Sequence, residues 1–190
     1  RYMISIIGGK NKRTKLFVPL NYVRPTSSIK REAIFSILES YSLQNSFELY
    51  NNKCFIDFFA GSGSLGLEAI SRGASYVYFF ENNKNVVNVL LKNSEKICLD
   101  NQFEINQNDI TKTLNINCQY PVSVIFIDPP YKINIFNDLL VKIIKNKLIQ
   151  KNTIIVAELD KKTSFFVNKN LSIIKEKIYG KTKIMFLKKL

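Results

Sequence analysis

The stretch VSVIFIDPPYKI, residues 122–133, ends an apolar run with a carboxylate, two prolines and an aromatic ring. The Asp128 carboxylate and the Pro129 carbonyl could accept the two hydrogens of an exocyclic amino group and favour the pyramidal nitrogen that attacks a methyl group. Pro129 and Pro130 restrict the backbone that aims this carbonyl, and Tyr131 offers a face on which an extruded base could stack. The alternative is a plain turn that ends a buried strand.

A second stretch, FIDFFAGSGSLGLEAI, follows an apolar run and leads into a helical pattern. Gly61, Gly63 and Gly66 match the spacing of a dinucleotide-binding loop, and Glu81 ends the next expected strand, where an acid accepts hydrogen bonds from ribose hydroxyls. Glycines at such a turn let the backbone approach a ligand. A tight strand–helix turn without a ligand is the alternative, as is a solvated strand end for Glu81.

Asp57 favours S-adenosylmethionine over NAD as the ligand of this loop. It lies inside the expected strand, four residues before Gly61, where a carboxylate can reach the ammonium group that S-adenosylmethionine carries and NAD lacks. The chain is also too short to add a second domain for a hydride acceptor. Asp109, after the third strand of the core, could meet an adenine amino group or could belong to a surface turn.

The two stretches need an α/β fold to bring them together. Continuous apolar strands indicate a parallel sheet covered on both faces, with ligands at the carboxyl ends of strands where the strand order reverses. The first and fourth strands of the core should be neighbours there, and the last two should form an antiparallel hairpin. The expected strands are 54–59, 76–80, 103–106, 122–127, 153–158, 171–179 and 183–187, and the expected helices are 64–72, 83–97, 135–148 and, more weakly, 161–168.

The first 45 residues predict an extension of this core. Apolar runs at 2–7 and 16–18 flank a Gly-Gly turn and a basic tip, which indicates a β-hairpin. A helix should follow Pro25, capped by a hydroxyl among residues 26–28, with Ile29, Ala33, Ile37 and Tyr41 on one face. We expect an RNA-binding extension at 1–45 and a catalytic domain at 46–190, in one compact unit.

Composition narrows the class of function. The 190 residues include no histidine, which excludes Ser-His-Asp and Cys-His catalysis and histidine-ligated metals, and the three cysteines are widely spaced. We therefore expect no metal site and a reducing, cytoplasmic environment, and no apolar run is long enough to span a membrane. The net charge is +13, and residues 1–31 contain no acid, so a nucleic acid is the favoured partner.

With these motifs in place, the chain resembles the D-type small-subunit rRNA methyltransferase family, which methylates the N2 amino group of a guanine in bacterial 16S rRNA with S-adenosylmethionine. The resemblance covers nearly the whole chain. It rests on IIGGKNKRTKL (6–16), RPTSSIKREAIFSIL (24–38), DFFAGSGSLGLEAISRGA (57–74), FFEN (79–82), ND (108–109) and FIDPPY (126–131). It implies a Rossmann-like class I methyltransferase fold with a seven-stranded, mostly parallel sheet, a C-terminal antiparallel hairpin and the N-terminal β-hairpin arm.

The resemblance also implies roles for individual residues. Asp128, Pro129, Pro130 and Tyr131 would hold the target base. The cofactor would be bound by Asp57, Ala60, Gly61, Ser62, Gly63, Glu81, Asn82 and Asp109. RNA would be bound by Lys10, Lys12, Arg13 and Lys15 of the hairpin and by Arg24 and Thr26, which would close over the site. The substrate would be 16S rRNA in a partly or fully assembled small subunit, with contacts to ribosomal proteins.

The motif at Asp128 is shared by several amino methyltransferases, so it indicates an amino nitrogen without choosing the base. The guanine assignment depends on the block at residues 24–38. Adenine-N6 methylation of DNA or RNA is therefore the alternative reaction, and an NAD-dependent oxidoreductase is a more distant one. An RNA-binding assembly factor without activity is the alternative of a different class.

Overall fold

A computed structural model describes residues 3–19, 26–110, 112, 114, 116–129, 133–163 and 169–190, without the side chains of 133–135. The expected residues Arg24, Pro130 and Tyr131 lie outside this part of the chain. The strands are β1 (Met3–Ser5), β2 (Lys15–Phe17), β3 (Cys54–Phe58), β4 (Tyr76–Phe80), β5 (Phe103–Asn106), β6 (Val122–Ile127), β7 (Ile154–Asp160), β8 (Leu171–Tyr179) and β9 (Thr182–Lys189). The helices are α1 (Ser28–Gln44), α2 (Ser64–Arg72), α3 (Lys84–Ile97) and α4 (Ile133–Lys145).

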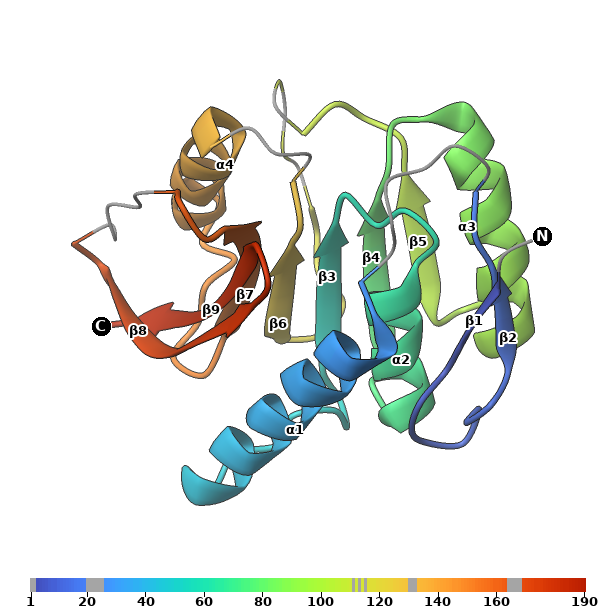
Figure 1. The fold of residues 1–190 in the computed structure, drawn as a ribbon, viewed down its shortest axis with the longest axis horizontal. Coiled ribbons are helices and arrows are strands. Elements are labelled where there is room, and N and C mark those ends of the chain that lie inside the picture. The colour runs from blue at the N-terminus through green and yellow to red at the C-terminus, as the bar shows by residue number, and fades with distance from the viewer. Residues whose placement is uncertain are drawn as a thin grey trace.

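A seven-stranded sheet forms the centre of the molecule (Figure 1), with the strand order β5-β4-β3-β6-β7-β9-β8. The first five of these strands pair in parallel, whereas β9 pairs antiparallel with both β7 and β8. The expected parallel sheet and the C-terminal hairpin are thus confirmed. The strand order reverses between β3 and β6, which are hydrogen-bonded neighbours, so the glycine loop and the Asp128 stretch leave the sheet side by side.

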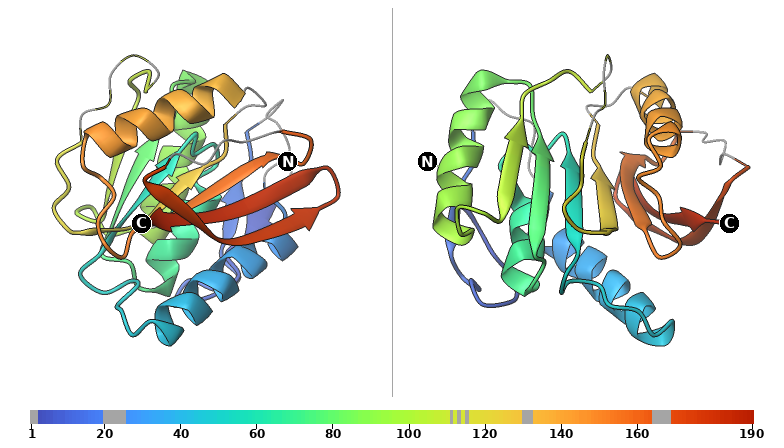
Figure 2. Two further views of the ribbon diagram at one scale, coloured as in Figure 1. Left: turned by 90° about the vertical axis from the view of Figure 1, so that its left-hand side faces the viewer. Right: turned by 180° about the vertical axis from the view of Figure 1, so that it is seen from behind.

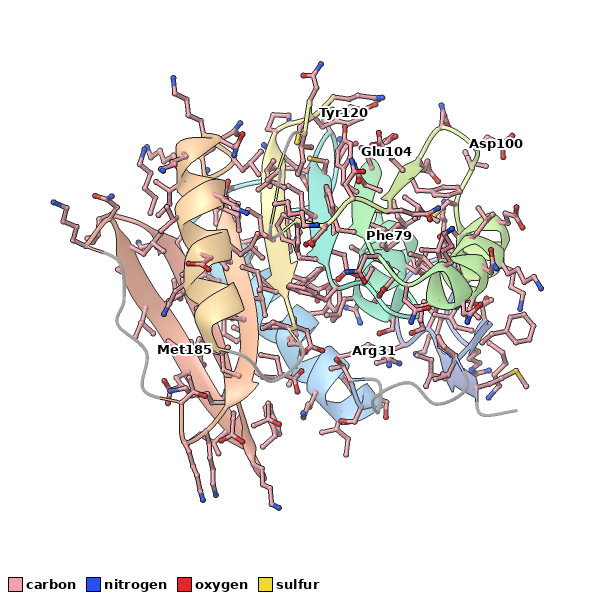
Figure 3. All side chains as sticks on the ribbon, turned by 90° about the horizontal axis from the view of Figure 1, so that it is seen from above. Arg31, Phe79, Asp100, Glu104, Tyr120 and Met185 are labelled. Atoms are coloured by element: carbon pink, nitrogen blue, oxygen red, sulfur yellow. The ribbon has the colours of Figure 1, made fainter. Side chains whose placement is uncertain are left out.

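Helices cover both faces of the sheet (Figure 2). One apolar cluster joins residues of α1, α2 and α3 to the face that carries Phe55, Phe79 and Phe126, while a second joins α4 to the opposite face. Figure 3 shows the molecule from above, with Arg31 labelled on α1 and Tyr120 labelled near the start of β6. The N-terminal hairpin shares the first cluster, because Ile6 and Leu16 are buried in it.

Local sequence signals account for the helix ends. The Ser27 hydroxyl accepts a hydrogen bond from the Lys30 amide at 3.3 Å and caps α1. Gly73 ends α2 with a φ of 117°, a left-handed conformation that glycine adopts without strain. At the weaker expected helix, residues 161–163 form a turn, so the prediction is wrong there, and residues 164–168 lie outside the described chain.

The expected apolar face of α1 is wrong at Ile29, whereas Ile37 and Tyr41 do pack against the first apolar cluster. Ile29 is 71% exposed, and the buried stripe consists of Arg31, Ile34, Phe35 and Leu38. The guanidinium of Arg31 donates to the carbonyl oxygens of Thr26 at 2.9 Å and Ser5 at 2.7 Å. These bonds allow a charged side chain to occupy a core position and fasten α1 to β1.

Candidate functional site

Asp57 occupies the deepest polar position at the carboxyl edge of the sheet. In the parallel pairings it lies opposite Phe79 of β4 and Phe126 of β6. Because side chains alternate along a strand, Asp57 points to the same face as these two rings, the face covered by α1 and α2. The side chain is buried, and its Oδ2 accepts a hydrogen bond from the Gly66 amide at 3.0 Å.

Three further carboxylates form the next row of this face. Phe126 is opposite Val156 of β7, and two residues beyond Phe79, Phe126 and Val156 stand Glu81, Asp128 and Glu158. The period of two places all three on the Asp57 face. Four acids thus converge at the edge where the sequence predicted a ligand, in a chain whose net charge is +13.

The backbone of β3 turns away before it reaches this second row. Phe59 has a φ of 62°, a left-handed conformation that costs a non-glycine residue roughly 1–3 kcal/mol. Gly61 and Gly63 follow with φ values of 56° and 79°. A Cβ on Gly63 would lie 2.4 Å from Cδ1 of Leu90, so only glycine fits there. The loop therefore leaves the plane of the sheet directly after Asp57.

Glu81 ties this loop to the start of α3. Its Oε2 accepts from the Gly61 amide at 3.1 Å, and its Oε1 accepts from the Asn83 amide at 3.0 Å. Among the other expected cofactor residues, Ala60 and Ser62 are buried in the loop and Asn82 is exposed. Asp109 is half-buried in the segment after β5. The structure thus brings Asp57, the glycine loop and Glu81 together.

Asp128 is half-buried at the end of β6, and Pro129 beside it is buried. Burial, and then the negative charge of Glu158, raise the pKa of Asp128 to about 7, against the opposing effects of Lys30 and of a hydrogen bond from the Thr26 side chain. Thr26 was expected to close over the site and does contact it. Lys30 and Glu158 were not expected here.

Burial also raises the pKa of Asp57 well above its usual range, and the charges of Asp128 and Glu81 add to this effect, against the hydrogen bond from Gly66. A group of acids that is costly to ionise together favours a positively charged ligand. The ammonium and sulfonium groups of S-adenosylmethionine are such charges, so the residues at this edge fit that cofactor.

The basic tip of the N-terminal hairpin lies away from this edge. Lys10, Lys12, Arg13 and Lys15 are all exposed, as RNA contacts require. The Lys10 amide donates to the carbonyl of Ser71 at 2.8 Å, near the end of α2, and α2 ends beside the amino edge of the sheet, where Ser75 bonds to Lys53. The tip and the carboxylate rows therefore lie at opposite ends of α2.

Two buried side chains connect the hairpin to the core. Both oxygens of Glu68 accept from the hairpin backbone, from Ile7 at 2.8 Å and from Gly8 at 2.7 Å. Asn93 of α3 accepts from the Phe17 amide at 2.8 Å and donates to the carbonyls of Phe17 and Ser62, each at 2.9 Å. The Asn93 amide thereby joins β2 to the glycine loop.

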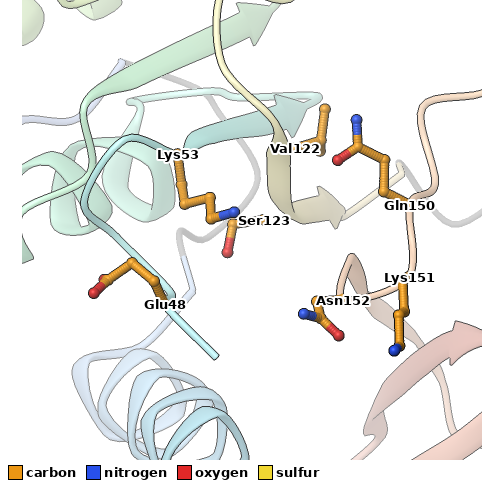
Figure 4. Close-up of a pocket in the computed structure, with 7 residues that line it drawn as sticks. All are labelled: Glu48, Lys53, Val122, Ser123, Gln150, Lys151 and Asn152. Carbon is orange, nitrogen blue, oxygen red and sulfur yellow. The ribbon is translucent and has the colours of Figure 1, made fainter. Parts of the chain in front are cut away.

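A small cavity of about 130 Å³ opens at the other edge of the sheet (Figure 4). It lies where β3 and β6 begin and is lined by Glu48, Lys53, Val122, Ser123, Gln150, Lys151 and Asn152. None of the residues expected to bind ligand lines it, so it is separate from the candidate site.

Within the ranges that the structure describes, no group of three or more acidic, cysteine or histidine side chains is arranged to hold a metal ion. Over the same ranges, no helix has the length and apolar character needed to cross a membrane.

Comparisons with known proteins agree with the motifs. The family model described as conserved hypothetical protein 95 matches residues 4–188. Ribosomal RNA small subunit methyltransferase D of Buchnera aphidicola is 36% identical over 92% of this chain and 87% of its own, and the Haemophilus influenzae protein of that name is 34% identical over 93% and 89%. A solved structure of a candidate methyltransferase from Escherichia coli superposes with a TM-score of 0.82 at 26% identity, covering 99% of this chain and 98% of its own.

Proposed function

Because the chain belongs to the conserved hypothetical protein 95 family, that of the D-type small-subunit rRNA methyltransferases, we propose that it methylates the N2 amino group of a guanine in 16S rRNA. The methyl donor is S-adenosylmethionine, and the substrate is the bacterial small ribosomal subunit in the cytoplasm. The observation that carries the proposal is the position of Asp128 beside the glycine loop. Their strands, β6 and β3, are hydrogen-bonded neighbours with carboxyl ends at one edge.

The cofactor, when bound, supplies a methyl group on a positively charged sulfur. Asp57 would hold its ammonium group, which relieves the cost of burying this carboxylate near Asp128 and Glu81. Glu81 would hold the ribose, since a carboxylate offers about four acceptor positions and the amides of the loop and of α3 hold it at the edge of the site. The amides of Gly61 and Ser62 would line the methionine end, and Asp109 would meet the adenine.

Asp128 would accept a hydrogen bond from the amino group of the target base and so orient its nitrogen towards the methyl group. The nitrogen would form the new N–C bond, the electrons of the broken S–C bond would stay with sulfur, and one amino proton would pass to the Asp128 carboxylate or to water. The Pro129 carbonyl would accept the second amino hydrogen, and Tyr131 would stack on the base. Because positioning alone supplies several kcal/mol in such reactions, about 7–11 in favourable cases, the end of β6, a strand hydrogen-bonded to β3 and β7, suits this role.

The exposed lysines and arginine of the hairpin support rRNA as the partner. Lys10, Lys12, Arg13 and Lys15 form a positive surface that can contact phosphates. Ribosomal proteins near the modified nucleotide would complete the binding surface. The hairpin therefore acts on affinity and placement, while the carboxylate rows act on the reaction.

The test is methyl transfer from labelled cofactor into small subunits that lack the modification, followed by nucleoside analysis of the rRNA. We expect N2-methylguanosine. The Asp128→Asn variant should lose at least about 100-fold in turnover while it still binds rRNA, whereas Asp138→Asn, an exposed acid on α4, should behave as the wild type. N6-methyladenosine in the product, or no label in rRNA, would refute the proposal.

A further inference from the structure

An ion pair between α1 and β7 touches the base-binding side of the site. Lys30, in the first turn of α1, places its Nζ 2.5 Å from Oε1 of Glu158 on β7. Both side chains are largely buried, with 19% and 16% of their areas exposed. A pair of this kind contributes little net stability, because desolvation offsets the Coulomb attraction. Its position suggests another role.

The pair stands directly beside Asp128. Ile127 is opposite Ala157 in the parallel pairing of β6 and β7, so Asp128 and Glu158 are the next residues on two strands about 4.8 Å apart. Both point to the α1 face of the sheet, where Lys30 pairs with Glu158. The charge of Glu158 also acts on Asp128, together with that of Lys30. Two acceptors and one donor therefore lie next to one another, with Lys30 bonded to Glu158 and Glu158 beside Asp128.

Guanine presents complementary hydrogen-bonding groups on its Watson–Crick edge. Its N2 amino group and N1–H are donors and its O6 is an acceptor, whereas adenine offers an amino group beside an N1 that accepts. We propose that Glu158 accepts from N1–H of the target guanine and that Lys30 donates to O6, while Asp128 holds the N2 amino group. This assignment rests on the proposed function and deepens it by naming the residues that select the base.

The pair can bind a base without separating. A carboxylate has about four acceptor positions and an ammonium group has three hydrogens, so the 2.5 Å contact occupies one on each side. An adenine in the same place would direct its N1 lone pair at the Glu158 carboxylate. A site that leaves buried polar groups unpaired rejects a ligand strongly. The selection therefore arises from repulsion of the wrong base as well as attraction of the right one.

A guanine analogue separates this role from a structural one. The nucleotide modified by the wild type is first mapped, and small subunits are then reconstituted with 2-aminopurine at that position. This base keeps the amino group at C2, but its N1 accepts and it has no O6. Wild-type protein should prefer guanine in kcat/KM by roughly 10- to 100-fold, since each matched contact discriminates by about 1–3 kcal/mol.

Glu158→Gln and Lys30→Met are the informative variants. The side-chain amide introduced by Glu158→Gln can donate to N1 of 2-aminopurine, so this variant should slow guanine methylation at least about tenfold and bring the two substrates within a few-fold of each other. Lys30→Met should slow guanine methylation and leave the 2-aminopurine rate nearly unchanged. Glu176→Gln, which alters an exposed acid on the edge strand β8, should change neither rate.

The outcomes distinguish this inference from the function on which it rests. If the wild type makes N2-methylguanosine but both variants slow the two substrates by the same factor, Lys30 and Glu158 only fasten α1 to β7 and the inference fails alone. If the wild type modifies adenine, both fail. Thermal melting and calorimetric binding of S-adenosylhomocysteine verify folding, and should Glu158→Gln not fold, the Lys30→Met rates decide.

Discussion

Replacement of Asn93 by alanine tests whether the hairpin and the glycine loop are joined through one side chain. Asn93 is fully buried, and the substitution removes its three hydrogen bonds, two to Phe17 and one to the Ser62 carbonyl. The Ser62 residue is itself buried, so its carbonyl would lose a partner that water cannot easily replace. We expect Asn93→Ala to destabilise the fold and to weaken cofactor binding together.

The magnitude follows from those bonds. A buried group left without a partner costs about 1–3 kcal/mol, and the partly exposed Phe17 backbone costs less, so the free energy of unfolding should fall by roughly 2–4 kcal/mol. In a chain of this size that corresponds to a drop in Tm of roughly 4–16 °C. Thermal melting and urea titration measure the stability, and calorimetry with S-adenosylhomocysteine measures the affinity.

Asn88→Ala is the matched control, because Asn88 lies on the same helix and is exposed. It should change the free energy of unfolding by less than about 0.5 kcal/mol. If Asn93→Ala costs no more than this control, the reasoning from the hydrogen bonds is wrong. If stability falls but cofactor affinity is unchanged, Asn93 supports the hairpin without acting on the loop.

Three further predictions concern the site and the arm. Because the pKa of Asp128 is raised to about 7, the folded chain binds more protons than the unfolded chain between the usual carboxyl range and pH 7. The free energy of unfolding, measured by urea titration, should therefore fall as pH rises through that window, while kcat/KM should rise. Asp128→Asn should remove both trends. Gly66→Ala would place a Cβ 2.4 Å from Cε1 of Phe79, and thermal melting should show a loss of roughly 1–3 kcal/mol, whereas an unchanged Tm would contradict the close packing. Binding to small subunits should weaken roughly tenfold or more between 50 and 200 mM salt, and replacing Lys12 and Arg13 by glutamine should lower the slope; a flat response would show that the arm does not contact phosphates.

Strands and the glycine loop could be predicted because their signals are local. Apolar runs bounded by turns located the seven strands, and the observed β4, β5, β6 and β8 match the expected ranges. The neighbouring positions of β3 and β6 followed from the rule for strand order reversal. Gly61 and Gly63 adopt left-handed conformations in the loop where the glycine spacing indicated a tight turn. Apart from that topological rule, each of these predictions depends on residues close together in the chain.

The rest depends on contacts between distant residues. The apolar spacing wrongly placed Ile29 on the buried face of α1 and missed Arg31, because the core position of Arg31 depends on carbonyls supplied by Thr26 and Ser5. Glu158 ended an expected strand and was assigned no role from the sequence, because only the register of β7 against β6 places it beside Asp128. Lys30 lay in the block that indicated guanine, but its partner is 128 positions away.

The hairpin tip contacts the end of α2. This position would set a minimum length for an RNA substrate that contacts both the tip and the target site. Eight residues of α2, from Ser64 to Ser71, lead from the glycine loop to the Ser71 carbonyl that receives Lys10, a rise of about 12 Å. An RNA that touches both the tip and the target site must extend along that whole length. A single nucleotide cannot do so. In the proposed function, the position of the arm would therefore favour a folded rRNA surface over a short free strand.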